Sequence, residues 1–156
     1  MQDAPIIRFN SASEILNFAI AKEIEAGQFY LDWADKVKSK TVRQVLIEFA
    51  EEELKHRDLL QQVKNGDNFK TNTKHLTDLR ITDHFTVILP ESQMSYQDAL
   101  RVAIQREMGA IELYRMLKDQ VNDTDLKDLF AHLEQEETRH KVRLESIYEN
   151  DFMKGN

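Results

Sequence analysis

The stretch that decides the fold is FAEEELKHRDLL at residues 49–60, and a related stretch, LEQEETRHKVRL, follows at residues 133–144. Each stretch contains a Glu three positions before a His: Glu53 with His56, and Glu137 with His140. The second pair lies 84 positions after the first. Residues three apart are neighbours on a helix surface. Each pair therefore presents a carboxylate and an imidazole on one helical face.

A second pair of residue types repeats at the same offset. A lone Glu lies thirty positions before each Glu-x-x-His pair, and a Tyr follows that Glu by seven positions: Glu23 with Tyr30, and Glu107 with Tyr114. The chain is therefore built as two similar halves. Each half supplies two Glu and one His as candidate metal ligands, together with one Tyr.

Four segments show the three-and-four spacing of apolar residues that is typical of amphipathic helices. This spacing and its start and stop signals predict helices at about residues 12–38, 41–64, 96–121 and 124–149. The crossover at residues 66–94 is long enough to run back along a helix, and Leu76 to Phe85 is expected to form a short helix. We therefore expect an all-α fold, a four-helix bundle of two helical hairpins joined by a long crossover, as one domain spanning residues 1–156.

The spacing brings the candidate ligands of each half to the same height in the bundle. The midpoint between the lone Glu and the His falls in the expected turn, at residues 38–41 in the first half and 122–124 in the second. At about 1.5 Å rise per residue, both hairpins place these side chains about 25 Å from the turn. One layer of the bundle should therefore receive all of them.

The six candidate ligands fall midway along apolar stripes that face the core: Glu23, Glu53, His56, Glu107, Glu137 and His140. Burying an unpaired carboxylate is costly, so four that converge require cations. Two divalent ions offset four negative charges, while imidazole binds neutral. This oxygen and nitrogen set without sulfur favours two iron ions, with manganese as the second choice. The alternative is a metal-free network of protonated carboxyl groups.

Other acidic and His residues lie off these stripes. Five of them are expected to be solvated: Glu51, Glu52, Glu134, Glu136 and His132. His75 and His84 lie in the crossover without partners at ligand spacing, so we expect surface or packing roles for both.

Composition and charge exclude several classes of function. The formal net charge of -7 argues against a nucleic-acid partner, because phosphate binding depends on patches of Lys and Arg. Cysteine is absent, which excludes disulfides, thiolate catalysis and iron-sulfur clusters, so electrons for a metal centre must come from another molecule. The sequence shows neither a secretory signal nor an apolar run that could span a bilayer. We expect a cytoplasmic protein without a membrane partner.

The motifs of both halves resemble those of the ferritin-like diiron proteins, and within them the rubrerythrin-type group. The resemblance covers about residues 13–148 and rests on two motif sets: Ala21-Lys22-Glu23 through Phe29-Tyr30 with Glu53-x-x-His56, and Gln105-Arg106-Glu107 through Leu113-Tyr114 with Glu137-x-x-His140. It implies a ferritin-like bundle in which Glu53 and Glu137 bridge two metal ions. Glu23 and Glu107 are then terminal ligands, and each His binds one metal.

The resemblance also bears on the tyrosines and on the reaction. Tyr30 and Tyr114 match tyrosines that lie beside the ligands of such sites or near their redox chemistry, and half-buried core tyrosines with a hydrogen-bonded hydroxyl are the alternative. Rubrerythrins carry a four-Cys rubredoxin domain, which this sequence lacks, and an additional Glu where this sequence has Ala110. The symmetric set of six ligands looks more like the ferroxidase centre of a haem-containing ferritin.

These features predict a diiron oxidoreductase that reduces peroxide or dioxygen. Its electrons would come from an external donor protein or from incoming ferrous iron. One alternative is an iron binding, storage or delivery protein without turnover, and another is a metal-free helical interaction module. Apolar residues outside the ligand stripes, such as Ile24 and Ile111, either widen the core or cover a partner surface, and we expect a homodimer.

Overall fold

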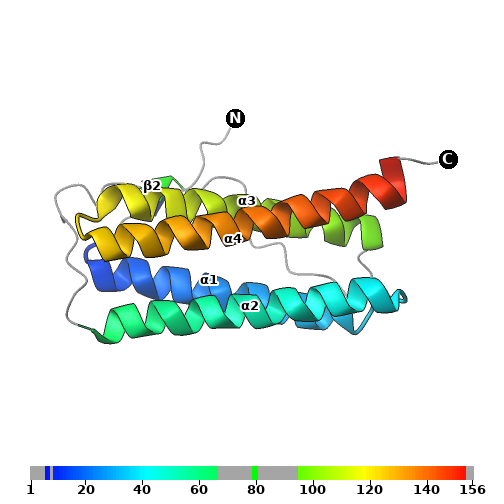
Figure 1. Cartoon of the computed structure of the whole chain (residues 1–156), viewed down its shortest axis with the longest axis horizontal. Helices are drawn as coiled ribbons and strands as arrows, with labels where there is room; N and C mark the ends of the chain where they lie inside the picture. Colours follow the sequence, from blue (N-terminus) through cyan, green and yellow to red (C-terminus); the bar gives the residue numbers. More distant parts are fainter. Residues whose placement is uncertain (1–5, 8, 67–78, 81–94, 154–156) are drawn as a thin grey trace.

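A computed structural model of the chain describes residues 6–7, 9–66, 79–80 and 95–153. Four long helices form two antiparallel hairpins that lie side by side (Figure 1). The helices are α1 (Ala12–Ala34), α2 (Lys40–Asn65), α3 (Tyr96–Gln120) and α4 (Thr124–Tyr148). In Figure 1 α2 and α3 run in the same direction, as a long connection between them requires. The predicted all-α bundle of two hairpins is confirmed.

Each helix begins at a residue whose side chain accepts a hydrogen bond from a backbone N–H three positions later. These residues are Ser11, Ser39, Ser95 and Asp123. Such caps satisfy backbone donors that have no partner inside the helix. They fix where the helices start, and so they fix the height of each ligand in the bundle.

Three of the four helices lie within one residue of the expected bounds, but α1 ends at Ala34 instead of near residue 38. Arg43 on α2 supplies the physical reason. Its Nε donates to the carbonyl oxygen of Ala34 at 3.2 Å, and its Nη2 donates to that of Val37 at 2.9 Å. The guanidinium thus replaces the partners that a longer helix would provide for these carbonyl groups.

Short elements flank the bundle. Strand β1 (Ile6–Ile7) pairs antiparallel with strand β2 (Leu79–Arg80). The prediction of a short helix from Leu76 to Phe85 is therefore wrong for the two residues of β2. Pairing with a strand that is distant in the sequence overrides the helical spacing of apolar residues in this segment. The rest of that segment, with His75 and His84, lies outside the described residues. After α4, the chain continues as a π-helical turn, η3 (Glu149–Met153).

The core consists of two apolar clusters with a polar layer between them. One cluster includes Trp33, Phe49, Leu100 and Leu144. The other includes Leu16, Leu60, Leu117 and Phe130. On every helix, the buried Glu and His residues lie between the positions that belong to the two clusters. The apolar clusters therefore hold the bundle together on both sides of the polar layer.

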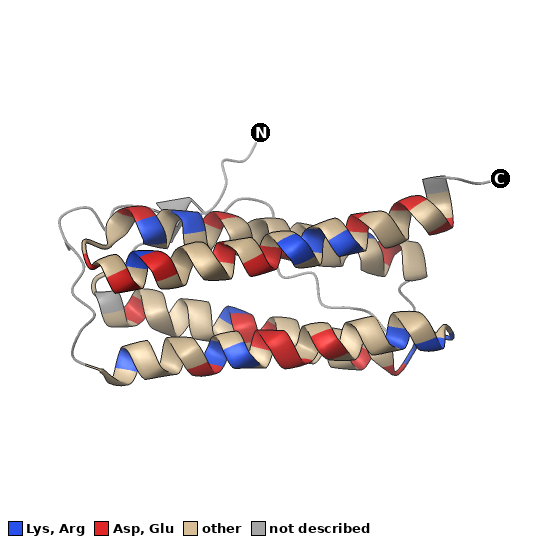
Figure 2. Ribbon diagram, in the orientation of Figure 1, with Lys and Arg blue, Asp and Glu red and all other residues tan. Residues whose placement is uncertain are grey.

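The outer surface carries both signs of charge. Figure 2 shows Lys and Arg scattered among Asp and Glu along the described helices. None of these helices combines the length and the apolar character that crossing a membrane demands.

Arg43→Met should destabilise the protein, because it removes both bonds that end α1 and keeps the aliphatic stem. We expect the free energy of unfolding to fall by about 1–2 kcal/mol in urea titrations. Arg57→Met is the matched control, since the Arg57 guanidinium pairs only with its exposed neighbour Asp58 among the described residues. Equal effects of the two changes would contradict the capping role of Arg43.

Candidate metal centre

The structure brings all six candidate ligands into the polar layer. Each is at most 3% exposed: Glu23 from α1, Glu53 and His56 from α2, Glu107 from α3, and Glu137 and His140 from α4. Their side chains form two groups of four. The first group is Glu23, Glu53, His56 and Glu137, and the second is Glu53, Glu107, Glu137 and His140. Within each group, one potential ligand atom per residue lies within 4.8 Å of the others.

The two imidazole rings point the same nitrogen into the cluster. The Nδ1 of His56 lies 2.8 Å from Oε1 of Glu137 and 3.6 Å from Oε2 of Glu23. The Nδ1 of His140 lies 2.9 Å from Oε1 of Glu53 and 3.5 Å from Oε1 of Glu107. Each His of one hairpin therefore approaches the Glu-x-x-His carboxylate of the other hairpin. Glu53 and Glu137, which belong to both groups, lie where the two groups meet.

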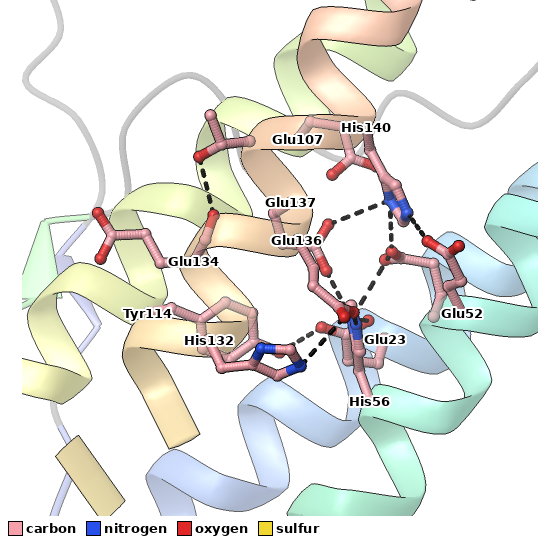
Figure 3. A network of polar contacts seen from close by, with 12 residues as sticks. Glu23, Glu52, His56, Glu107, Tyr114, His132, Glu134, Glu136, Glu137 and His140 are labelled. Carbon is pink, nitrogen blue, oxygen red and sulfur yellow. Dashed lines mark hydrogen bonds and ion pairs between the residues drawn. The ribbon is translucent and has the colours of Figure 1, made fainter. Parts of the chain in front are cut away.

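Two further carboxylates lie behind the imidazole rings. The Nε2 of His56 is 2.5 Å from Oε2 of Glu136, and the Nε2 of His140 contacts Oε2 of Glu52 (Figure 3). The prediction that Glu52 and Glu136 are simply solvated is therefore wrong. Carboxylates in this place orient an imidazole and make its other nitrogen a stronger ligand.

A signal for these carboxylates is present in the sequence. Both halves read Glu-Glu-x-x-His, so the Glu that precedes each pair repeats at the same offset. The other residues expected to be solvated remain at the surface. Glu51 and His132 are exposed, while Glu134 pairs with Arg115 and Lys118.

The tyrosines connect the two halves. The Tyr30 hydroxyl donates to Oε1 of Glu107 at 2.5 Å, and the Tyr114 hydroxyl donates to Oε1 of Glu23. Both tyrosines are 1% exposed. Burial and the neighbouring carboxylates raise the pKa of both hydroxyls well above the usual range, so both stay protonated. Each is therefore a buried hydrogen-bond donor to a predicted ligand of the other hairpin.

Burial controls the charge of the metal-free cluster. Loss of hydration and the nearby carboxylates raise the pKa of Glu53 and Glu137 well above their usual range. Burial alone would lower the pKa of His140, but contacts with Glu107 and Glu53 outweigh it and raise the pKa to about 11. Without a metal, the layer therefore takes up protons to offset its negative charge.

The unpartnered atoms of the layer fit a metal. Among the described residues, five atoms of the cluster are buried without a hydrogen-bond partner: Oε2 of Glu23, Oε1 of Glu53, Oε2 of Glu107, Oε2 of Glu137 and Nδ1 of His140. Of these, Oε1 of Glu53 and Nδ1 of His140 lie 2.9 Å apart, but they are not oriented for a hydrogen bond. Such atoms are costly to bury unless a cation or proton meets them. Carboxylate oxygens with imidazole nitrogens suit iron and manganese. The donor set thus supports metal binding.

A small cavity reaches the layer between α1 and α3. Its volume is about 30 Å³, and its inner wall includes Glu23, Glu107 and Tyr114. The side chains of Glu25 and Arg106, 34% and 16% exposed, form its outer part and are joined by an ion pair of 2.8 Å. The cavity therefore lies between this ion pair and the carboxylates of the layer.

The fold and the polar layer together define a carboxylate metal centre in a ferritin-like bundle. The rubrerythrin family model matches residues 14–148, and the chain belongs to this family. No curated protein matches the chain.

Three solved structures share the fold. A hypothetical protein from Pyrococcus furiosus is 26% identical, with a TM-score of 0.70 over 89% of each chain. A protein from Thermotoga maritima, described as a candidate ferritin-like diiron-carboxylate protein, is 20% identical, with a TM-score of 0.72 over 95% of this chain and 97% of that one. An uncharacterized conserved protein from Magnetospirillum magnetotacticum is 24% identical, with a TM-score of 0.64 over 90% of this chain and 95% of that one.

The raised pKa values predict how stability depends on pH. Glu53, Glu137 and His140 bind protons more tightly in the folded metal-free protein than in the unfolded chain. Their contribution to stability is therefore lost as the pH rises toward the raised values. We expect the free energy of unfolding, measured in urea with a chelator present, to fall between about pH 5 and about pH 8. Bound metal should reverse this trend, because it replaces the protons.

The matched variants use Gln as a permanent mimic of a protonated Glu. Glu53→Gln with Glu137→Gln should remove the part of the pH dependence that these two carboxyl groups cause, raise the stability of the metal-free protein at pH 8 and weaken metal binding. Glu51→Gln, at an exposed position, should leave all three unchanged. A metal-free protein whose stability does not change over this pH range would contradict the protonated state of the layer.

Proposed function

We propose that the protein is a diiron-carboxylate oxidoreductase that reduces peroxide or dioxygen with electrons from an external donor protein or from ferrous iron. The observation that carries this proposal is the pair of four-residue groups that share Glu53 and Glu137. Two groups with two common carboxylates suit two metal ions held side by side. The donor set favours iron, with manganese as the second choice.

The roles of the ligands follow from their membership of the two groups. When bound, two ferrous ions supply the two electrons that, with two protons, reduce one hydrogen peroxide molecule to two water molecules. Glu53 and Glu137, which belong to both groups, would hold both ions, while Glu23 and Glu107 would hold one each. The two His residues would bind through Nδ1, because Nε2 faces Glu136 or Glu52.

The small size of the cavity favours a small oxidant as the substrate over a larger organic molecule. Its volume of about 30 Å³ is enough for one small molecule. A larger cavity of about 450 Å³ lies near the turn between α1 and α2, lined by Trp33, Val42 and Tyr96 among others, and none of the six ligands reaches it. Peroxide and dioxygen fit the cavity that meets the carboxylates.

Tyr114 differs from Tyr30 in its access to the oxidant. Both hydroxyls donate to a carboxylate of the layer, but only Tyr114 lines the small cavity. Tyr114 therefore holds a proton beside the place that a small molecule enters. Its role in the reaction is to keep Glu23 in position and to offer that proton.

A second candidate function is iron binding, storage or delivery without turnover. Ala110 favours this second function. Rubrerythrins with peroxide-reducing activity carry an additional Glu at the equivalent position, and this chain has Ala there. Ala110 lines the small cavity, where such a Glu would add a carboxylate. The ferroxidase type of reaction, in which incoming ferrous iron is itself the electron donor, connects the two functions.

Rapid mixing of the anaerobic ferrous protein with hydrogen peroxide, and separately with dioxygen, tests the redox function. We expect ferric absorption to appear within seconds for at least one oxidant, with two irons bound per chain. Iron bound at that ratio with no change in absorption would contradict the proposal. Size-exclusion chromatography separates the alternatives, because a storage cage requires many subunits and we expect a homodimer.

Tyr114→Phe should slow oxidation by about tenfold or more while iron binding is kept, because a positioned proton donor is lost. Tyr30→Phe is the matched control, since Tyr30 makes the same type of bond away from the cavity. We expect Tyr30→Phe to slow the reaction less. Equal rates for the two variants would contradict entry of the oxidant through this cavity.

The remaining partners belong to the same proposal. An external electron donor would dock on the outer surface, where the charges are mixed (Figure 2). We expect no nucleic-acid partner, because Lys and Arg are interleaved with Asp and Glu, and we expect the protein to act in the cytoplasm.

A further inference from the structure

The two halves of the centre differ in what holds the carboxylate behind each His. In the second half, Glu136 contacts His56 through Oε2 at 2.5 Å. Its other oxygen, Oε1, lies 3.0 Å from Nε2 of His132, one turn earlier on α4 (Figure 3). A line of three side chains therefore runs from the surface to the cluster. Glu136 is held at both oxygens.

The corresponding line is missing in the first half. Glu52 contacts His140, but the position equivalent to His132 at the offset of 84 is Glu48. Glu48 accepts a hydrogen bond from Gln44, and Glu52 has no second partner among the described residues. A like charge one turn away disfavours a fixed position for Glu52.

Exposure to water adds to this difference. The Glu52 side chain is 45% exposed, whereas that of Glu136 is 23% exposed. Water therefore competes more strongly for the carboxylate behind His140. The hydrogen bond that orients His56 is better shielded.

Packing against the His140 ring does not make up for the weaker hold on Glu52. His140 stacks on Phe49, with ring centroids 4.2 Å apart. This contact restrains the plane of the imidazole, but an aromatic face offers no hydrogen-bond acceptor comparable to a carboxylate. The strength of Nδ1 as a ligand depends mainly on the carboxylate at the opposite nitrogen.

We propose that His132 is a positioning residue that makes the two metal positions inequivalent. The position formed by Glu23, Glu53, His56 and Glu137 binds a divalent cation more tightly than the position that contains His140. His132 acts through Glu136, which fixes the His56 ring. This inference rests on the proposed function only in requiring that the six ligands hold two metal ions.

Anaerobic titration of the metal-free protein with Mn²⁺ tests the inference without any redox step, since electron paramagnetic resonance counts the free ion. We expect two dissociation constants that differ by more than the statistical factor for two equal sites. His132→Ala should weaken the tighter constant by about three- to tenfold, less than the loss typical of a residue in direct contact with a ligand. His132→Gln, which keeps a donor for Glu136, should restore most of the affinity.

The equivalent position in the first half provides matched controls. Glu48→Ala should leave the tighter constant unchanged. Glu48→His should strengthen the weaker one, because it builds the missing contact with Glu52. In crystals with one equivalent of Mn²⁺, anomalous density should appear beside His56.

Other results overturn the inference in distinguishable ways. Density beside His140, equal density at both positions, or an unchanged tighter constant in His132→Ala would overturn it while leaving the metal centre intact. Equal weakening of both constants by His132→Ala would assign His132 a general structural role and also overturn it. A protein that binds Mn²⁺ at neither position would overturn the proposed function together with this inference.

Discussion

The constraint on which the structure depends is the burial of four carboxylates in one layer of a helical bundle. Every one of them is at most 3% exposed, and the groups that meet them in the cluster include His56 and His140. Their charge is offset by protons in the metal-free protein and by cations in the loaded one. The apolar clusters on either side make this arrangement possible, because they supply the packing that the polar layer cannot.

Much of the fold and the ligand set could be predicted from the duplicated pattern. Apolar spacing is a strong signal in long helices, and a Glu on an apolar stripe stands out because unpaired Glu is seldom buried. Contacts between the hairpins were harder to predict. Glu52 and Glu136 lie beside the apolar stripe, and only the three-dimensional pairing of α2 with α4 reveals which His each one contacts.

The remaining differences have local causes. The early end of α1 depends on Arg43, which lies on another helix and carries no sequence signal for a helix end. The strand at Leu79–Arg80 depends on pairing with Ile6–Ile7, which is distant in the chain. Spacing within a segment cannot report on a partner outside it. Tertiary contacts therefore decided both features.

The bonds between the tyrosines and the lone carboxylates make the two hairpins depend on each other. Tyr30 reaches Glu107 and Tyr114 reaches Glu23, so each hairpin completes the environment of the other. Neither hairpin alone carries a full set of donors. Two identical hairpins related by a twofold axis would satisfy the same bonds. Because this chain contains both hairpins, equivalent positions can carry different residues, as His132 and Glu48 do at the offset of 84.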